Sequence, residues 1–304
     1  MDQPAHPPRW KTILAFAIIY LVWGSTFLAI RIGVHEIPPF LMAAMRFVAA
    51  GSVLVAWTLS RREKLPRARE WGSVCAVAFL IFVIDYGGVF WAEQRVASGI
   101  TAVIMATISL FMTLFEIVLL GTQRFTARLG VALAVGIAGV AVLVSPSLNV
   151  GGSAVDAVGA GVLLCAAVAF ALSSALSRRL TLPSSKVMSS GVQMLVGGVM
   201  LAVLSASAGE MRGFRFAAVS RGAWMALAYL VVAGSIVAFT AYVWLIHHES
   251  PTRVGTYAYV NPVVAVLFGY FLGGEELGVR TVVGSVCVLV SVVAIATMPR
   301  PTAN

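Results

Sequence analysis

Runs of apolar residues, each bounded by charged residues, proline or glycine, follow one another along the whole chain. Their usual length of about 20 residues is that of an α-helix that crosses a hydrocarbon core of about 30 Å. The pattern predicts ten membrane-spanning helices joined by short connections, over residues 12–34, 39–59, 71–91, 98–120, 127–145, 158–179, 186–207, 222–246, 252–273 and 280–298. None of the connections is long enough to form a soluble domain.

The run over residues 252–273 has one charge, Arg253, and carries Asn261 and Pro262 near its middle. Proline lacks a backbone donor, so it leaves the carbonyl of Ala258 without its helical partner, and the asparagine amide adds polar groups that lipid does not satisfy. We therefore expect an interrupted helix here that faces protein or water. Interrupted helices near the bilayer centre are where secondary transporters commonly bind substrate.

The composition indicates a membrane protein, so the positive net charge need not indicate binding to nucleic acid. Hydrophobic residues make up 60% of the chain and charged residues 11%, with a mean hydropathy of +0.95, far from the balance of soluble domains. The net charge of +9 comes from short loops, and no RNA- or DNA-binding module holds these residues. The expected partner is therefore the lipid bilayer and not nucleic acid. Cys75, Cys165 and Cys287 are far apart within predicted helices, so no disulfide framework or metal site is expected.

Lysine and arginine are concentrated in the loops on one side of the predicted bundle. The cluster at residues 61–69 and the pair Arg178 and Arg179 are on that side, together with the basic residues near both chain ends. Cytoplasmic loops of membrane proteins carry such an excess. The pattern predicts a multi-pass protein with both termini in the cytoplasm.

The two halves of the chain resemble each other. The segment RFVAAG at 46–51 aligns with QMLVGG at 193–198, which pairs Arg46 with Gln193, and a second alignment places Ser109 opposite Pro262. Five helices in each half is an odd number, so the second half must enter the membrane from the other side. We predict an all-α membrane protein of ten transmembrane helices, built as two inverted five-helix repeats over residues 12–145 and 158–298.

Four stretches carry a resemblance to a known family. They are WGSTFLAIRIG at 23–33, PPFLMAAMRFVAAG at 38–51, VASGITAVIMAT at 96–107 and YAYVNPVVAVLFGYFLGGE at 257–275. In these stretches the chain resembles the EamA type of the drug/metabolite transporter superfamily, and within it the YedA-like bacterial inner-membrane exporters. The resemblance implies a carrier that exports small metabolites, often amino acids, through a cavity lined by both repeats. The family often has proline where this chain has Ser109, so we expect a milder break in the first half.

Arg46 and Asp85 are charged residues within predicted spans, where an unpaired charge is costly and commonly functional. Two interpretations of Arg46 remain open. It faces the cavity and binds a substrate carboxylate, or it forms an ion pair with Asp85, which lies at a similar depth. Asp85 is also the candidate for proton coupling. For Glu116, near the end of its helix, we favour contact with lipid headgroups.

Depth and position in the repeats select the other candidate substrate-binding residues. Aromatic residues and methionine in membrane helices usually serve packing, so the prediction concerns the set more than any member. Together they describe a cavity of modest polarity that suits amphipathic small molecules. They are Trp23, Thr26, Tyr86, Phe90, Met105, Gln193, Tyr242, Tyr257 and Asn261.

Other classes of membrane protein leave signatures that the sequence lacks. No GxGD, HExxH, GxSxG or nucleotide-binding P-loop occurs, which argues against an intramembrane enzyme and against ATP as the driving force. A channel would show a recognisable filter or rings of charge from repeated subunits. We expect a secondary exporter without cofactor or metal, with a small molecule as its partner. Efflux of multiple drugs or cationic compounds by the same fold is the alternative, and an intramembrane enzyme is a weaker one.

Overall fold

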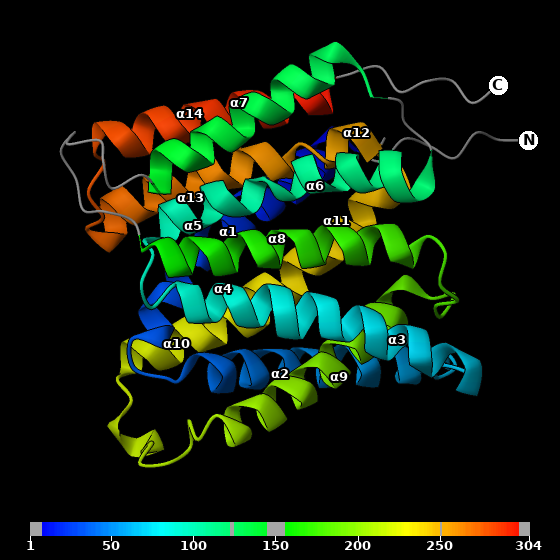
Figure 1. Cartoon of the computed structure of the whole chain (residues 1–304). Coiled ribbons are helices and arrows are strands. Elements are labelled where there is room, and N and C mark those ends of the chain that lie inside the picture. Colours follow the sequence, from blue (N-terminus) through cyan, green and yellow to red (C-terminus); the bar gives the residue numbers. More distant parts are fainter. Residues whose placement is uncertain (1–7, 122–124, 145–155, 250, 298–304) are drawn as a thin grey trace, which may run out of the picture.

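The computed structural model describes residues 8–121, 125–144, 156–249 and 251–297, and within these ranges all regular structure is helical. The helices lie side by side in a bundle (Figure 1). In the first half they are α1 (Arg9–Val34), α2 (Pro39–Ser60), η1 (Ala68–Glu70), α3 (Trp71–Ala78), η2 (Phe79–Tyr86), α4 (Gly87–Ala92), α5 (Ser98–Ala106), α6 (Ile108–Phe115), η3 (Glu116–Leu120) and α7 (Ala127–Val144).

The second half follows a similar succession of elements, without a counterpart of η3 among the described residues. They are α8 (Ala157–Ser177), α9 (Lys186–Ser207), η4 (Phe216–Ala218), α10 (Arg221–Tyr229), η5 (Leu230–Val237), α11 (Ala238–His248), α12 (Pro251–Val254), α13 (Tyr257–Gly273) and α14 (Val279–Ala296).

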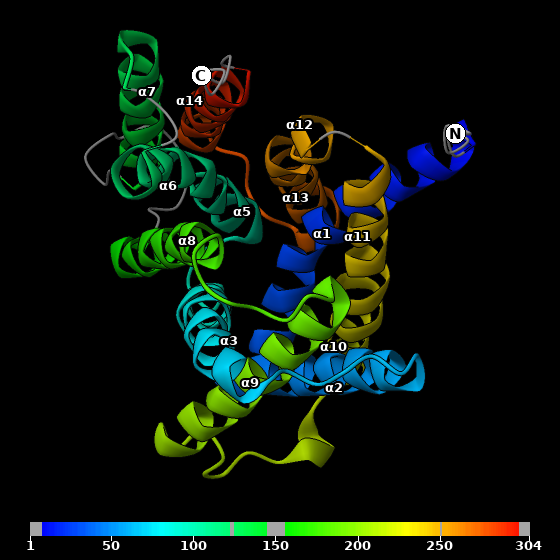
Figure 2. The ribbon, with the colours of Figure 1, turned by 90° about the vertical axis from the view of Figure 1, so that its right-hand side faces the viewer.

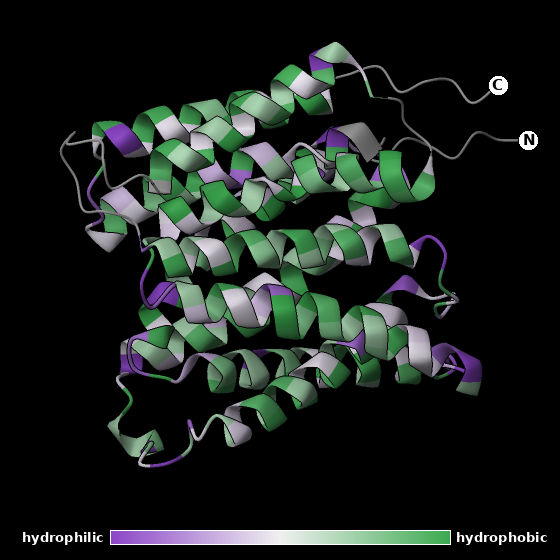
Figure 3. Cartoon of the chain, in the orientation of Figure 1, coloured by the Kyte–Doolittle hydropathy of each residue, from purple (hydrophilic) through white to green (hydrophobic). Residues whose placement is uncertain are grey.

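Seven helical stretches of the described chain are long and apolar enough to cross a membrane. Three shorter apolar helices accompany them, over Ala127–Leu143, Tyr257–Gly273 and Val279–Ile295. Polar residues gather at the two ends of the bundle, and apolar residues cover its length (Figure 3). Large apolar side chains such as Met225, Phe271 and Leu272 are more than two-thirds exposed, which is favourable only where lipid covers them. The chain is a helical membrane protein.

Close helix pairs join the two halves. In Figure 2, α7 lies beside α14 and α2 crosses α9. A Cβ atom on Gly139 of α7 would lie 2.9 Å from the carbonyl oxygen of Gly284 of α14, and a Cβ on Gly284 would lie 2.9 Å from that of Gly139. In α2, a Cβ on Gly51 would lie 2.6 Å from the backbone nitrogen of Leu195 in α9. Small residues let these backbones approach closely.

The third long stretch of each half contains a π-helical segment, η2 in the first and η5 in the second. Such wide turns are frequent at functional sites because they rotate the following side chains and loosen the backbone hydrogen-bond ladder. η2 ends with Asp85 and Tyr86, and η5 contains Gly234 and Ser235.

The interruptions of the helices differ from the sequence-based expectation. Pro262 lies inside α13, which continues through it, and the chain breaks earlier, at Gly255 and Thr256. Proline is tolerated there because it is only the sixth residue of the helix and removes a single hydrogen bond, to Ala258. The first half also breaks, at Thr107 between α5 and α6, although it has no proline there.

The first and last helices place both ends of the described chain on one side: α1 begins and α14 ends at the same end of the bundle (Figure 1). The turns from α1 to α2, from α4 to α5 and from α13 to α14 lie at the opposite end. We call these the terminal end and the far end.

Candidate functional site

Arg46, on α2, is a buried cation in the middle of the bundle, with 3% of its surface exposed. Its guanidinium carbon lies 5.0 Å from the ring centre of Phe47, 5.4 Å from that of Tyr86 and 6.0 Å from that of Phe90. Each desolvated cation–π contact stabilises the charge by up to about 2 kcal/mol. The rings therefore make an arginine tolerable at this depth without neutralising it.

The second half supplies the polar contact of Arg46. Its Nε donates a hydrogen bond of 2.9 Å to Oγ of Ser235 on η5, whereas its Nη1 is buried without a partner among the described residues. A Cβ on Gly234 would lie 3.2 Å from Nη2 of Arg46 and 3.0 Å from Cγ2 of Thr26. The cation therefore lies between α2, α1 and η5, with its Nη1 group left without a partner among the described residues.

Three aromatic side chains lie on the other side of Gly234. Nε1 of Trp23 donates a 3.1 Å hydrogen bond to the carbonyl of Gly234. The Trp23 ring lies 5.4 Å from that of Tyr242 and 5.1 Å from that of Tyr257, and the two tyrosine rings are 6.0 Å apart. Helices α1, α11 and α13 thus meet in an aromatic cluster directly next to the Arg46 site.

Most of the residues singled out from the sequence are therefore brought together. Seven of them form one continuous set of contacts, which we call the central cluster: Trp23, Thr26, Arg46, Tyr86, Phe90, Tyr242 and Tyr257.

No described hydrogen bond, ring contact or cation–π contact links Met105, Gln193 or Asn261 to the central cluster. Met105 lies in the core around α5, and Nε2 of Gln193 donates to Ser189 of its own helix. Asn261 is buried on α13, where α1 passes closely: a Cβ on Gly24 would lie 3.1 Å from its carbonyl oxygen. The Oδ1 of Asn261 has no partner among the described residues.

Asp85 is buried on η2, and no ion pair of the described residues joins it to Arg46. Its Oδ1 has no hydrogen-bond partner there. Of the two interpretations of Arg46, the ion pair is not the one observed: its contacts are Ser235 and the aromatic rings. Glu116 forms an ion pair of 2.8 Å with Arg178, and its predicted contact with lipid headgroups stays a prediction.

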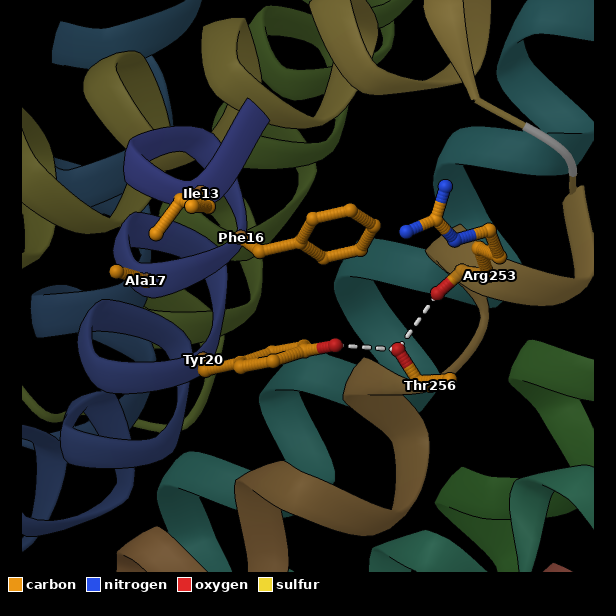
Figure 4. Close-up of a pocket in the computed structure, with 6 residues that line it drawn as sticks. All are labelled: Ile13, Phe16, Ala17, Tyr20, Arg253 and Thr256. Atoms are coloured by element: carbon orange, nitrogen blue, oxygen red, sulfur yellow. Dashed lines mark hydrogen bonds between the residues drawn. The ribbon is translucent and has the colours of Figure 1, made fainter. Parts of the chain in front are cut away.

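A cavity of about 410 Å³ opens towards the terminal end, between the first half of α1 and the α12–α13 break (Figure 4). It is lined by Ile13, Phe16, Ala17, Tyr20, Arg253 and Thr256. The hydroxyl groups of Tyr20 and Thr256 are hydrogen bonded to each other, and the Phe16 ring points towards Arg253. Thr256 directly precedes Tyr257, and Tyr20 lies about one helical turn before Trp23, so the cavity reaches the edge of the central cluster.

At the far end, Glu275 in the turn after α13 caps helix α5. Its carboxylate accepts hydrogen bonds from the backbone nitrogen and Oγ of Ser98, both 2.7 Å, and from the nitrogen of Gly99, 3.0 Å. Carboxylates are stabilised at helix N-termini by unpaired N–H groups and the helix dipole. The turn of the second half is therefore attached to a helix of the first.

Arg31, near the end of α1, completes this closure. Its Nε lies 3.4 Å from Oε1 of Glu275, and its Nη1 donates to the carbonyls of Glu93, at 3.3 Å, and Val96, at 2.6 Å. We call Arg31, Glu275 and the start of α5 the latch. Among the described residues no group of His, Cys, Asp and Glu side chains is placed to hold a metal ion.

Sequence reasoning missed several residues of this arrangement. Ser235 and Gly234 look like ordinary small residues of a membrane helix, and only the π-helical turn brings them to Arg46. Arg31 and Glu275 carried a usable signal, because each is a charge close to the end of an apolar run.

The comparisons with known proteins agree with this architecture. The sequence profile of the EamA-like transporter family matches residues 10–145 and again residues 157–297. The chain is 41% identical over 264 residues to the inner membrane transporter YedA of Escherichia coli (strain K12), covering 86% of this chain and 83% of that one. It is 26% identical over 277 residues to a chloroplastic WAT1-related protein of Arabidopsis thaliana, covering 90% and 66%.

A solved crystal structure shares the fold, with a TM-score of 0.64 and 21% sequence identity over 95% of this chain and 98% of the other. The double profile match and the identity to YedA place the chain by sequence, and the shared fold is consistent with that placement. This protein belongs to the EamA-like transporter family of the drug/metabolite transporter superfamily, and is a membrane transporter.

Proposed function

We propose that this transporter is a secondary carrier that exports small amphipathic metabolites such as amino acids across a bacterial inner membrane by alternating access. The observation that carries the proposal is Arg46: a buried guanidinium with an unpartnered Nη1, held between helices of both halves and next to an aromatic cluster. A guanidinium suits a carboxylate, with which it forms strong charge-assisted hydrogen bonds. The aromatic cluster suits an apolar side chain.

Ten spans arranged as two inverted repeats explain the pairing of helices. In this arrangement α2 and α9 are equivalent, as are α7 and α14, and each of these pairs packs together. The alignment that pairs Arg46 with Gln193 also pairs Arg31 with Arg178. Arg31 forms an ion pair with Glu275 at the far end and Arg178 with Glu116 on η3, in both cases between the two halves. The repeats correspond to residues 12–145 and 158–298.

The distribution of Lys and Arg supports a cytoplasmic terminal end. The 410 Å³ cavity then opens to the cytoplasm and leads substrate towards Trp23 and Tyr257. Its size is within the range of small-molecule sites. The latch closes the opposite face in this state.

Efflux of cationic compounds is the second candidate. The Trp23, Tyr242 and Tyr257 rings are suited to binding a cation by its π contacts, and Asp85 is a buried carboxylate with an unpartnered Oδ1. The two candidates differ in which charge of the substrate the protein requires.

Counterflow in liposomes distinguishes them. Leucine and phenylalanine are compared with the amines that lack only their carboxylate, in the unchanged protein and in Arg46→Gln. We expect counterflow of the amino acids and not of the amines, and a loss of about tenfold to hundredfold in kcat/KM in Arg46→Gln, because a hydrogen bond to a charged group contributes about 1.5–3 kcal/mol.

Arg212→Gln, which changes an exposed arginine, is the matched control and keeps the original rate. Transport of the amines at the rate of the amino acids, unaffected by Arg46→Gln, would contradict the carboxylate proposal and favour cation efflux. Flux without trans-stimulation would instead indicate a channel.

A further inference from the structure

Glu93, directly after α4 at the far end, is fully buried, and both of its carboxylate oxygens lack a partner among the described residues. Its backbone carbonyl accepts a hydrogen bond from Arg31, so it lies against the latch. Nothing in the central cluster or the proposed substrate path uses this side chain. Buried polar groups in proteins are normally hydrogen bonded, so packing alone does not explain a carboxylic acid at this position.

The nearby cations do not form an ion pair with the Glu93 carboxylate. Arg31 on α1 directs its Nε to Glu275 instead, and the negative charge of Glu275 repels a charge on Glu93. Arg46 on α2 acts on Glu93 only at longer range, and η2 carries Asp85 and Tyr86 about two turns away along the same helical stretch.

On the side of α8, Arg95 faces Asp156 at 3.9 Å and forms no described bond with Glu93. Burial first, and the Glu275 carboxylate second, raise the pKa of Glu93 well above its usual value. Arg31 and, more weakly, Arg46 oppose this shift, but the Arg31 charge is shared with the Glu275 carboxylate.

Ionising a carboxylate that is buried without a partner is strongly unfavourable, so the geometry favours the neutral form of Glu93 while the latch is closed. In the open state that alternating access requires, water would reach Glu93, and its pKa would fall towards that of a free glutamate, about 4.3. Near neutral pH the side chain would then ionise. Closing of the far end would therefore require the uptake of a proton.

We infer that Glu93 is a proton-binding site that takes up one proton from water when the latch at the far end closes and returns it when the latch opens. The inference rests on the proposed alternating access and adds its coupling to pH. Because the closed state holds one more proton than the open state, acid favours the closed state. At pH values between the pKa of Glu93 in the open state and its pKa in the closed state, the ratio of open to closed protein rises with pH, by at most tenfold per pH unit.

A buried reporter cysteine measures this ratio. Thr101, in the first turn of α5 behind the latch, is fully buried, so the thiol of Thr101→Cys reacts with an impermeant sulfonated maleimide only when the far end opens. Cys75, Cys165 and Cys287 are first replaced by alanine. Ser207→Cys, at an exposed position of the same end, gives a reference rate that cancels the pH dependence of the thiol itself.

In the purified full chain in lipid nanodiscs, we expect the ratio of the two labelling rates to rise several-fold per pH unit between pH 6 and 8. Glu93→Gln and Glu93→Leu, two neutral replacements of which either suffices if the other does not fold, remove this dependence and keep labelling low. Glu276→Gln, which changes an exposed carboxylate next to Glu275, keeps the dependence.

A ratio that is independent of pH with Glu93 present, a slope that persists in both neutral replacements, or a slope lost in Glu276→Gln would each overturn the inference. Counterflow of leucine and phenylalanine is measured on the same preparations. Counterflow together with pH-independent labelling rejects the role of Glu93 and leaves the carrier intact, whereas failure of counterflow rejects the proposed function itself.

Discussion

At the scale of single residues, the central cluster depends on the space that Gly234 leaves open. Because Gly234 has no side chain, the guanidinium of Arg46 can lie close to its backbone. Trp23 donates its hydrogen bond to the carbonyl of the same glycine. Thr26 fills the remaining room and donates its own hydroxyl back to the Trp23 carbonyl, at 2.6 Å. The position of the charge is therefore determined by a glycine that carries no chemistry of its own.

Gly234→Ala tests this dependence. The added methyl group lies 3.0 Å from Cγ2 of Thr26 and 3.2 Å from Arg46 Nη2, so the guanidinium must move. We expect counterflow of leucine to fall about tenfold, the effect of losing one charge-assisted hydrogen bond. Thr26→Ser, which removes Cγ2 but keeps the hydroxyl, restores part of the rate when combined with Gly234→Ala.

Gly161→Ala, where a Cβ would meet nothing within 4 Å, is the control and leaves transport unchanged. An unchanged rate in Gly234→Ala, or a double variant no better than the single one, would show that Arg46 does not need this space.

At the scale of elements, the positions of the helices along the chain could be predicted better than the contacts between side chains of different helices. Within the described residues each predicted apolar run is helical, seven of them as stretches long enough to cross a membrane and three as shorter apolar helices, because backbone in lipid must satisfy its own hydrogen bonds. The partner of Arg46 was not predictable: Asp85 lies at a similar depth, but η2 and η5 rotate their side chains, so that Ser235 meets Arg46 instead. The phase of a helix after a π-helical turn does not follow from hydrophobic spacing.

The close contact between α7 and α14 leads to a prediction about stability. A Cβ on Gly139 would lie 2.8 Å from Cβ of Cys287 and 2.9 Å from the backbone nitrogen of Val288, so Gly139→Ala forces the two helices apart. We expect a loss of stability of about 1–3 kcal/mol, as for other overpacked contacts. A lower thermal unfolding temperature in detergent, with Gly161→Ala unchanged, is the result to look for, and equal unfolding temperatures would contradict this close contact.

At the scale of the whole molecule, one end is closed by a buried contact and the other is more open. Arg31 and Glu275 are 26% and 8% exposed, whereas Arg178, of the related pair with Glu116, is 51% exposed. The 410 Å³ cavity also lies towards the terminal end. The structure therefore resembles a carrier that is shut at the far end.

The sidedness of this arrangement is testable in cells. We expect single cysteines at Arg9→Cys and Thr297→Cys, at the two described chain ends, to resist an impermeant maleimide in intact cells, because the proposed orientation places these ends in the cytoplasm. Arg212→Cys, between α9 and α10 at the far end, is labelled. Labelling of both chain-end cysteines in intact cells would reverse the orientation, and labelling of only one would rule out an even number of spans.

The amino-acid order alone was enough to place the helices in a membrane, to indicate a repeated architecture and to mark Arg46, Trp23, Tyr242 and Tyr257 as candidates. These conclusions follow from run length, from charge inside apolar runs and from motifs, all of which are local along the chain. The partners of Arg46, the latch of Arg31 with Glu275 and the burial of Glu93 emerged only in the folded molecule. Each depends on which faces of distant helices meet, and lipid, which accepts any apolar face, leaves that choice to close packing between helices.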